Sequence, residues 1–225
     1  MTPAEVGAAL AAAVEDAAAQ GELAVPARVP VDVRCTGAGV YESPVALRLR
    51  VDPWVLARRV RGDVTSRGFV RVRCPEGALV PLVDESYGVA DVAKGVYWAD
   101  RPRTFDNPGF VVRFAYARAA WVVRAAGELG VENGPPEGYA GDELVLLRLL
   151  GEMPGWAAGE ARGFVSFLER LGRAYHDVHE RCPALPKGDE KPRAVHGARV
   201  ALARAARIAI GNGLTMIGET PRERI

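Results

Sequence analysis

A chain of 225 residues, 49% of them apolar and 25% charged, has a globular composition and enough length for two small domains. The formal net charge of +1 excludes the strong overall basicity that by itself indicates nucleic-acid binding. Cys35, Cys74 and Cys182 lie far apart, so neither a disulfide framework nor a zinc site is predicted. Because the sequence has no basic leader and no apolar run of about 18–20 residues, we expect a cytoplasmic protein without a membrane partner.

Residues 1–88 have the pattern of a small α+β unit. The first residues, TPAE at 2–5, match a capping box with proline in the first turn, and an alanine-rich helix over about 3–19 should follow. Apolar and polar residues alternate over 29–34 and again over 68–73, which is typical of half-buried strands. With a second helix predicted over 52–66, helices should cover one face of a sheet.

The second half of the chain has a helical pattern. Residues 89–106 are rich in turn formers and predict a linker. From residue 107 onward, apolar residues recur three and four positions apart, and prolines separate the segments. This predicts helices over 110–129, 142–152, 162–182 and 194–211 in a bundle of roughly four or five helices. The fold class of the whole chain is therefore predicted to be α+β.

Several motifs resemble those of arginyl-tRNA synthetases. Residues 39–47 (GVYESPVAL) resemble a Gly-Asp-Tyr-x-Thr-Asn-x-Ala-Leu segment in the N-terminal domain of the bacterial enzymes. Residues 112–118 (VRFAYAR), shortly after an Asn-Pro pair, are similar to the Val-Gln-Tyr-Ala-His-Ala-Arg opening of their anticodon-binding domain, the DALR domain. Residues 143–152, 170–186 and 212–218 continue that similarity in the same order and spacing. The resemblance covers most of 1–88 and nearly all of 107–225.

The resemblance implies an N-terminal additional domain followed by a helical anticodon-binding domain. In the synthetases a nucleotide-binding domain with His-Ile-Gly-His-like and Lys-Met-Ser-Lys-like signatures lies between these two parts. Here only the 89–106 linker lies between them, and His176, His179 and His196 form no such signature. The sequence has no Walker-type loop either. We therefore expect a protein that is not an enzyme, needs no cofactor and binds tRNA without charging it.

The VRFAYAR segment carries the first candidate RNA-binding residues. In the family, this helix helps to hold the anticodon loop, and single-stranded RNA is bound by flat side chains and cations. The matching positions make Phe114 and Tyr116 candidates for base stacking, and Arg113 and Arg118 candidates for phosphate contacts. Phe114 stands where the family usually has tyrosine, so one hydroxyl group is lost. Alternatively, Phe114 belongs to the core and the arginines are solvated.

The end of the chain carries three more candidates. Asn212, Arg222 and Arg224 correspond to parts of the family that pack beside the anticodon pocket. Alternatively, Asn212 belongs to a helix cap and the last residues form a frayed tail.

The N-terminal half has one charge asymmetry, within residues 48–73. Its eight arginines are Arg48, Arg50, Arg58, Arg59, Arg61, Arg67, Arg71 and Arg73. Within the same stretch only Asp52 and Asp63 oppose them. Arg71 and Arg73 share a strand face by their spacing of two, so they can meet backbone phosphates together. The alternative is an ordinary solvated face.

Residues 77–81 (GALVP) are matched to a Gly-Phe-Leu-Asn-Phe strand of the family. In that alignment Ala78 and Val80 replace the aromatic and amide groups that would contact a base of the tRNA D-loop. The alignment predicts that specific D-loop recognition has been lost.

His176, His179 and Cys182 lie three residues apart on one predicted helix. This spacing can place three metal ligands on one side of a helix. No fourth ligand is evident, and the resemblance makes the segment a packing element. We therefore expect core packing and no metal.

The leading functional hypothesis is a non-catalytic tRNA-binding protein that recognises the anticodon arm, with arginine tRNA as the candidate, for presentation or sequestration. One alternative is an adaptor that binds a protein such as a synthetase or a biosynthetic enzyme. Another is an accessory subunit of an enzyme that uses aminoacyl-tRNA. The expected nucleic-acid partner is RNA and not DNA.

Overall fold

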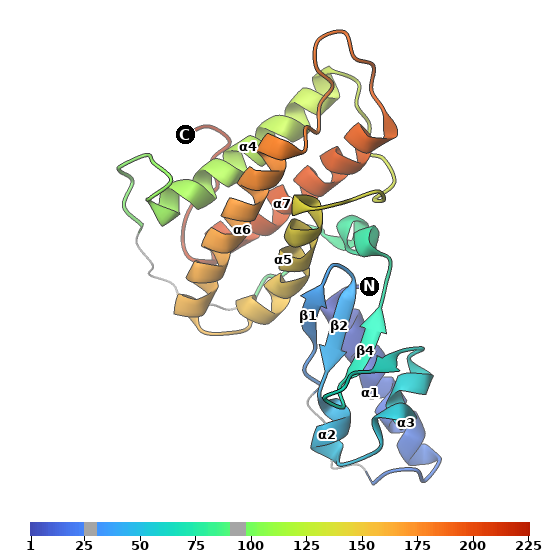
Figure 1. The fold of residues 1–225 in the computed structure, drawn as a ribbon. Coiled ribbons are helices and arrows are strands. Elements are labelled where there is room, and N and C mark those ends of the chain that lie inside the picture. The colour runs from blue at the N-terminus through green and yellow to red at the C-terminus, as the bar shows by residue number, and fades with distance from the viewer. Residues whose placement is uncertain (25–30, 91–97) are drawn as a thin grey trace.

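The computed structural model describes residues 1–24, 31–90 and 98–225. Figure 1 shows an α/β part and a helical bundle, joined end to end with α5 facing the tip of the sheet. The fold class is α+β, as predicted. In the described part of the chain, no helix has both the length and the apolar character needed to cross a membrane.

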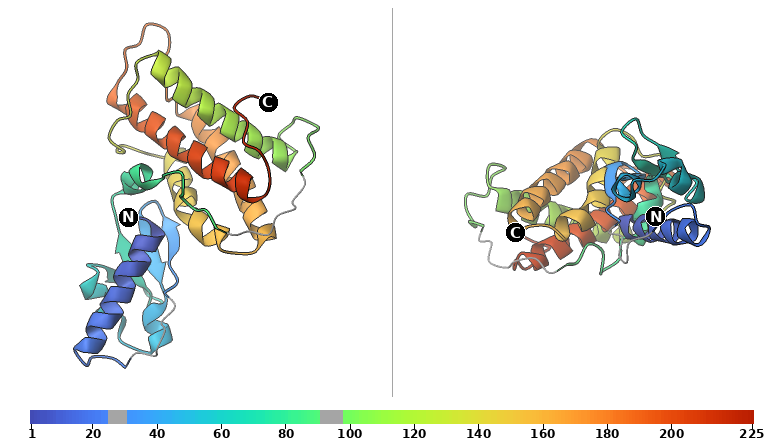
Figure 2. Two further views of the ribbon diagram at one scale, coloured as in Figure 1. Left: turned by 180° about the vertical axis from the view of Figure 1, so that it is seen from behind. Right: turned by 90° about the horizontal axis from the view of Figure 1, so that it is seen from below.

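Helix α1 (Pro3–Ala19) begins and ends where the sequence predicts. The Thr2 hydroxyl accepts a hydrogen bond from the Glu5 amide, and the Glu5 carboxylate accepts one from the Thr2 amide. This reciprocal cap satisfies two backbone donors at the start of the helix. The buried side of α1, which includes Val6 and Leu10, shares a hydrophobic core with the sheet residues Tyr41 and Val70. α1 runs across one face of the sheet (Figure 2).

The sheet has four antiparallel strands in the order β1-β2-β4-β3. They are β1 (Arg34–Gly37), β2 (Val40–Ser43), β3 (Asp63–Val64) and β4 (Val70–Arg73). The predicted strand over 68–73 is largely confirmed by β4. The predicted strand over 29–34 starts later, because β1 begins at Arg34 and residues 31–33 form no strand. Residues 25–30 lie outside the described part.

Two short helices, α2 (Val45–Leu49) and α3 (Pro53–Arg59), connect β2 to β3. The helix predicted over 52–66 is therefore wrong in its second half. The chain leaves the helix at Arg61, whose φ is 52°, and Gly62 passes so close to β4 that a Cβ would lie 2.4 Å from the Arg71 carbonyl oxygen. Sheet pairing thus overrides helical periodicity at this point.

The structure of residues 76–82 differs from the strand predicted over 77–81. They form a 3₁₀ helix, η1 (Glu76–Leu82), whose Leu79 and Val80 are buried in the core of the bundle. The match of 77–81 to a strand is therefore wrong. A Gly-Phe pair, Gly68 and Phe69, instead comes directly before the strand β4. Because Phe69 is aromatic, the replacements at Ala78 and Val80 do not show that D-loop recognition has been lost.

The bundle contains α4 (Pro108–Glu128), α5 (Asp142–Ala157), α6 (Ala161–Arg181) and α7 (Ala194–Met216). The four predicted helices are present, with α5 and α7 each about five residues longer than expected. α4 packs against both α6 and α7 (Figure 2). The large core side chains include Phe164, Phe167, Leu146 and Leu150.

The α/β part contacts the bundle through α5. β1 packs against α5, and a Cβ on Gly151 would lie 2.6 Å from the Cys35 thiol. The Tyr87 hydroxyl donates a 2.7 Å hydrogen bond to the Leu150 carbonyl. Residues 79–87 and Trp98 contribute side chains to the core of the bundle. The domain boundaries at 88 and 107 stay predictions, and residues 91–97 of the predicted linker lie outside the described part.

Candidate nucleic-acid interface

Four side chains form a continuous row on one side of α4, which we call the α4 row: Phe110, Phe114, Arg118 and Trp121. Their spacing of four, four and three residues places them on one helix face. The Phe110 and Phe114 rings stack with centroids 5.2 Å apart, and the Arg118 guanidinium lies 4.3 Å from the Phe114 centroid. Phe114 is therefore covered along the helix by a neighbour on each side.

Phe114 also belongs to a wider aromatic cluster. Its centroid lies 6.2 Å from that of Phe105 and 5.4 Å from that of His176. A base could stack on Phe114 only by displacing Arg118. The structure thus gives Phe114 a packing role, and the flat surface open to a base lies further along the row.

That surface is Trp121, which the sequence analysis missed. Its side chain is 48% exposed and makes an edge contact with the His179 ring at 6.1 Å. Trp121 lies seven residues after Phe114 and three after Arg118, and this spacing could have identified it. Exposed tryptophan offers the strongest stacking and cation–π surface among the side chains.

Tyr116 points away from the α4 row. It packs against α7, where a Cβ on Gly211 would come within 3.0 Å of the Tyr116 ring. Residues two apart on a helix do not face the same side. The structure therefore does not bring Phe114 and Tyr116 together.

Arg118 is held by two polar partners besides the Phe114 ring. Its Nη1 lies 3.0 Å from a Glu180 carboxylate oxygen and 3.1 Å from His176 Nδ1. Because arginine only donates, Nδ1 accepts, and Nε2 donates its proton to the Val111 carbonyl at 2.9 Å. Burial lowers the pKa of His176 to about 4. The Arg118 partner lowers the pKa of the exposed Glu180 carboxyl.

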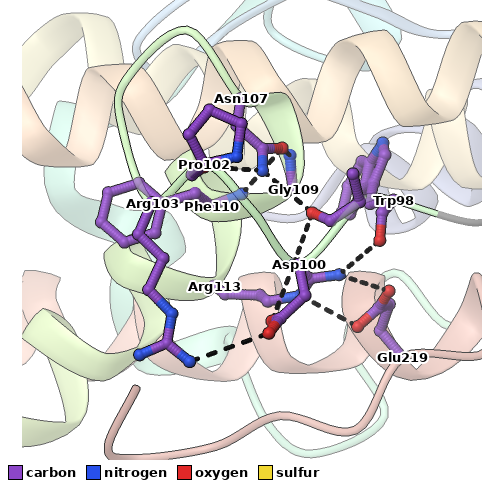
Figure 3. Close-up of polar contacts among 10 residues, drawn as sticks. Trp98, Asp100, Pro102, Arg103, Asn107, Gly109, Phe110, Arg113 and Glu219 are labelled. Carbon is purple, nitrogen blue, oxygen red and sulfur yellow. Dashed lines mark hydrogen bonds and ion pairs between the residues drawn. The ribbon is translucent and has the colours of Figure 1, made fainter.

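Arg113 ties α4 to two other segments (Figure 3). Its guanidinium lies 2.8 Å from Glu219 and donates hydrogen bonds to the carbonyl groups of Trp98 and Ala99 at 3.1 and 3.3 Å. Only 16% of its side chain is exposed. These contacts indicate that Arg113 holds the C-terminal segment against α4. They leave few of its N–H groups free to bind a phosphate.

The C-terminal segment lies beside the α4 row. Glu223 is paired with Arg124 at 2.9 Å and with Arg207 at 3.5 Å, which holds the segment on α4 and α7. Arg222 and Arg224 are exposed and have no ion-pair partner within the described residues. Both line a polar pocket of about 290 Å³.

Arg224 also joins the α4 row at a second cavity. With Arg118, Trp121 and His179 it lines a cavity of about 370 Å³. The structure therefore brings three of the predicted residues, Phe114, Arg118 and Arg224, to one place, although Phe110 and Arg118 cover the Phe114 ring. Asn212 is not part of that cavity: its side-chain amide donates to the carbonyl groups of Glu85 and Tyr87, both at 3.0 Å.

Arg71 and Arg73 share the polar face of β4, as predicted, but carboxylates from neighbouring strands accompany them. Arg71 lies 2.7 Å from Glu42 on β2, and Arg73 lies 3.3 Å from Asp63 on β3. Arg48 and Arg59 are likewise paired with acidic residues outside 48–73. The stretch is therefore less cationic than its own sequence indicates, because folding brings distant carboxylates to it.

His176, His179 and Cys182 pack into the bundle. His179 lies between the Trp121 and Tyr175 rings, and Cys182 contacts the core. Burial raises the pKa of the Cys182 thiol. Across residues 1–24, 31–90 and 98–225, no group of three or more potential ligands is placed to hold a metal ion. All three cysteines are free thiols.

No model of a known protein family matches the chain. Among curated proteins, the chain is similar to the arginine–tRNA ligase of Frankia alni (strain DSM 45986 / CECT 9034 / ACN14a), with 37% identity over 136 residues. The match covers 55% of this chain and 24% of the ligase, so the chain spans about a quarter of the length of that relative. The chain therefore contains an arginyl-tRNA synthetase-related region.

Proposed function

We propose that the chain is a non-catalytic tRNA-binding protein that holds an anticodon arm against the α4 row and the C-terminal segment. The observation that carries this proposal is the cavity of about 370 Å³ where Trp121 meets Arg118 and Arg224. An exposed ring beside cations is the combination that binds an unpaired base and its phosphates. The similarity to an enzyme that charges tRNA with arginine supports tRNA, and arginine tRNA in particular, as the RNA.

Each group at this cavity has a distinct role in the proposal. An unpaired base stacks on Trp121, and Arg224, which has no ion-pair partner among the described residues, meets an adjacent phosphate. Burial and the nearby Arg118 lower the pKa of His179, so its ring is neutral near pH 7 and both donates and accepts hydrogen bonds. Arg118 contributes its guanidinium plane, although Glu180 offsets part of its charge. In this arrangement, different side chains bind the base and the phosphates.

The proposal includes no catalytic activity for this chain. Adenylate formation by a class I synthetase depends on charged signatures that stabilise the phosphates of ATP. The printed sequence contains neither signature between its two synthetase-like parts. The protein would therefore present or sequester a tRNA that another enzyme charges.

The test is a titration of an arginine anticodon stem-loop and a loop-mismatched stem-loop with wild-type protein and Trp121→Ala. We expect the variant to lose about 1–3 kcal/mol of binding free energy and some discrimination between the loops. The matched control is Trp156→Ala, because Trp156 is also exposed but does not line the cavity. Absence of wild-type binding at low salt, or equal binding by Trp121→Ala, contradicts the proposal.

One observation favours an adaptor as the second candidate. Next to the first cavity, Trp121 and the exposed Leu129 line a larger cavity of about 450 Å³ that also includes Leu185. Apolar surface of this kind is typical of protein contacts. A synthetase or an enzyme that uses aminoacyl-tRNA would be the partner, and RNA binding would then be absent in the titration above.

A further inference from the structure

The cavity of about 450 Å³ beside the α4 row contains a polar group that none of the contacts above explains. Tyr175 of α6 lines this cavity, which we call the Tyr175 cavity, although the residue is only 1% exposed. Its hydroxyl makes no hydrogen bond to any residue in 1–24, 31–90 or 98–225. Because buried polar groups are normally hydrogen-bonded, this hydroxyl is available to a molecule that enters the cavity.

The other three buried tyrosines of the described residues show what Tyr175 lacks. Each hydroxyl donates to a backbone carbonyl group: Tyr41 to Met1 at 2.9 Å, Tyr87 to Leu150 at 2.7 Å and Tyr139 to Ala198 at 2.8 Å. Burial raises the pKa of Tyr175, so its hydroxyl keeps its proton near pH 7 and is a donor there. The group that would complete it is therefore a hydrogen-bond acceptor.

The walls of the Tyr175 cavity suit a flat aromatic molecule. Trp121 and His179 line it beside Tyr175, and the His179 ring lies 6.1 Å from each of the other two rings. The apolar side chains of the wall include Val122, Leu129, Val178 and Leu185. Small-molecule sites commonly have volumes of about 300–1,000 Å³ and combine apolar walls with a few polar groups. The Tyr175 cavity has both properties.

The charges around the Tyr175 cavity are balanced. Its charged lining residues are two acidic and two basic ones: Glu128, Glu180, Lys187 and Arg199. Glu180 is paired with Arg118, and Arg199 with Glu143. The remaining two, Glu128 and Lys187, are exposed and opposite in sign. A charged ligand would lose its hydration without meeting an excess of opposite charge, so an uncharged ligand is favoured.

The loop that closes the Tyr175 cavity is held in place. Residues 182–187 all line the cavity. The Arg199 guanidinium donates a 3.1 Å hydrogen bond to the Pro183 carbonyl, and its Nε lies 2.7 Å from the carboxylate of Glu143, which is 2% exposed. Pro183 and Pro186 further restrict the backbone of the loop. A site whose walls are fixed before binding loses less entropy when a ligand enters.

We propose that the Tyr175 cavity binds a small, uncharged aromatic molecule that lies against Trp121 and accepts a hydrogen bond from the Tyr175 hydroxyl. This inference goes beyond the proposed function, because such a ligand needs neither RNA nor a protein partner. A protein would meet the exposed Leu129 at the rim, whereas the buried donor inside favours a molecule small enough to enter. Trp121 lines both this cavity and the one assigned to RNA. A ligand in the Tyr175 cavity should therefore compete with the anticodon arm, and only this consequence rests on the proposed function.

Coumarin is the probe, because it is a flat, uncharged ring system with a carbonyl acceptor. In a titration followed by nuclear magnetic resonance, the backbone amides of Ala184, Leu185 and Lys187 should shift most. Tyr175→Phe keeps the ring and removes only the unpaired hydroxyl, so it should unfold at the temperature of wild type or higher. It should nevertheless bind coumarin about threefold to tenfold more weakly. Trp156→Ala changes a tryptophan outside the cavity and should bind coumarin like wild type.

The titration contains no RNA, so its result is independent of the proposed function. Equal coumarin affinity of Tyr175→Phe and wild type would overturn the inference. Absence of shifts at 182–187 in wild type would do the same and would leave the cavity to a protein partner. In a second arm, saturating coumarin should weaken binding of the anticodon stem-loop to wild type about fivefold or more. If wild type binds coumarin but no RNA, the proposed function fails and the inference stands. An unchanged stem-loop affinity would contradict the shared use of Trp121.

Discussion

Three arginines of α4 have carboxylate partners in three different places. Arg113 pairs with Glu219, Arg118 with Glu180, and Arg124 with Glu223. Each pair joins residues about sixty or more positions apart, so no local pattern in the sequence identifies the partner. The sequence predicted which helix carries the arginines, but only the fold shows which of them support structure and which stay available for RNA.

Phe114 is expected to matter for stability more than for RNA. Phe114→Ala removes a ring that contacts Phe105, Phe110, Arg118 and His176, and we expect a loss of about 2 kcal/mol in the free energy of unfolding. Urea denaturation followed by circular dichroism measures it. Trp121→Ala is the control, since the half-exposed Trp121 should cost less than about 1 kcal/mol. Equal stability of Phe114→Ala and wild type would remove the packing role argued above.

His176 predicts a specific pH dependence of stability. Its folded pKa of about 4 lies below its ordinary value of 6.5, so the unfolded chain binds more protons between these values. Stability contributed by neutral His176 is therefore complete above about pH 6.5 and is lost as the pH falls toward 4, by up to about 3 kcal/mol. Protonation would also place a second cation against Arg118. In His176→Gln the urea midpoint should fall less steeply over this window, and parallel curves for the two proteins would refute the assignment.

At the scale of elements, the sequence was informative where helices are long and capped. α1, α4 and α6 were predicted nearly to the residue, because each combines a sustained apolar stripe with proline in the first turn or with polar flanking segments. β2, α2 and β3 were not predicted. They contain two to five residues each, and a segment that short does not complete a period that could be recognised. Their existence depends on pairing and packing with segments elsewhere in the chain.

The cap of α4 should contribute more than an ordinary helix cap. The Asn107 side chain accepts hydrogen bonds from the Gly109 and Phe110 amides and donates to the Ala99 and Pro102 carbonyls, and it is buried (Figure 3). Asn107→Ala leaves buried donors and acceptors unpaired, so we expect a loss of about 2–3 kcal/mol in the free energy of unfolding.

The exposed cap of α1 provides the comparison for this prediction. Thr2→Ala should cost about 1 kcal/mol or less, because water replaces the lost partners. Thermal or urea unfolding of both variants, each against wild type, gives the two values. A loss in Asn107→Ala no larger than that in Thr2→Ala would show that the buried network adds nothing to the cap.

At the scale of the whole molecule, the candidate RNA-binding residues lie on two parts of the fold. The α4 row belongs to the bundle, Arg71 and Arg73 belong to the α/β part, and Figure 1 shows these parts end to end. The sequence predicted both parts and their order. It placed the RNA contacts of the α/β part at Arg71 and Arg73 without showing their ion pairs. Glu42, the partner of Arg71, lies outside residues 48–73, and Asp63, the partner of Arg73, lies within them but on another strand.

The purified chain should show no arginine activation. We expect arginine-dependent exchange of pyrophosphate into ATP to stay at the level of a reaction without protein, because the sequence lacks the signatures that would hold ATP. A complete arginyl-tRNA synthetase assayed alongside is the positive control. Exchange above background by this chain, and its loss after a single inactivating substitution, would overturn the non-catalytic proposal.

Because Cys35 of β1 lies against Gly151 of α5, the rate at which its thiol is alkylated should report how often the two parts separate. Burial raises the pKa of the Cys35 thiol to about 12, and because only the thiolate reacts with alkylating reagents, Cys35 should be almost inert near pH 8 while the parts remain in contact. Modification of Cys35 then proceeds only as fast as the sheet separates from α5. A tRNA that contacts both parts should slow that modification, whereas a stem-loop that touches the bundle alone should leave its rate unchanged.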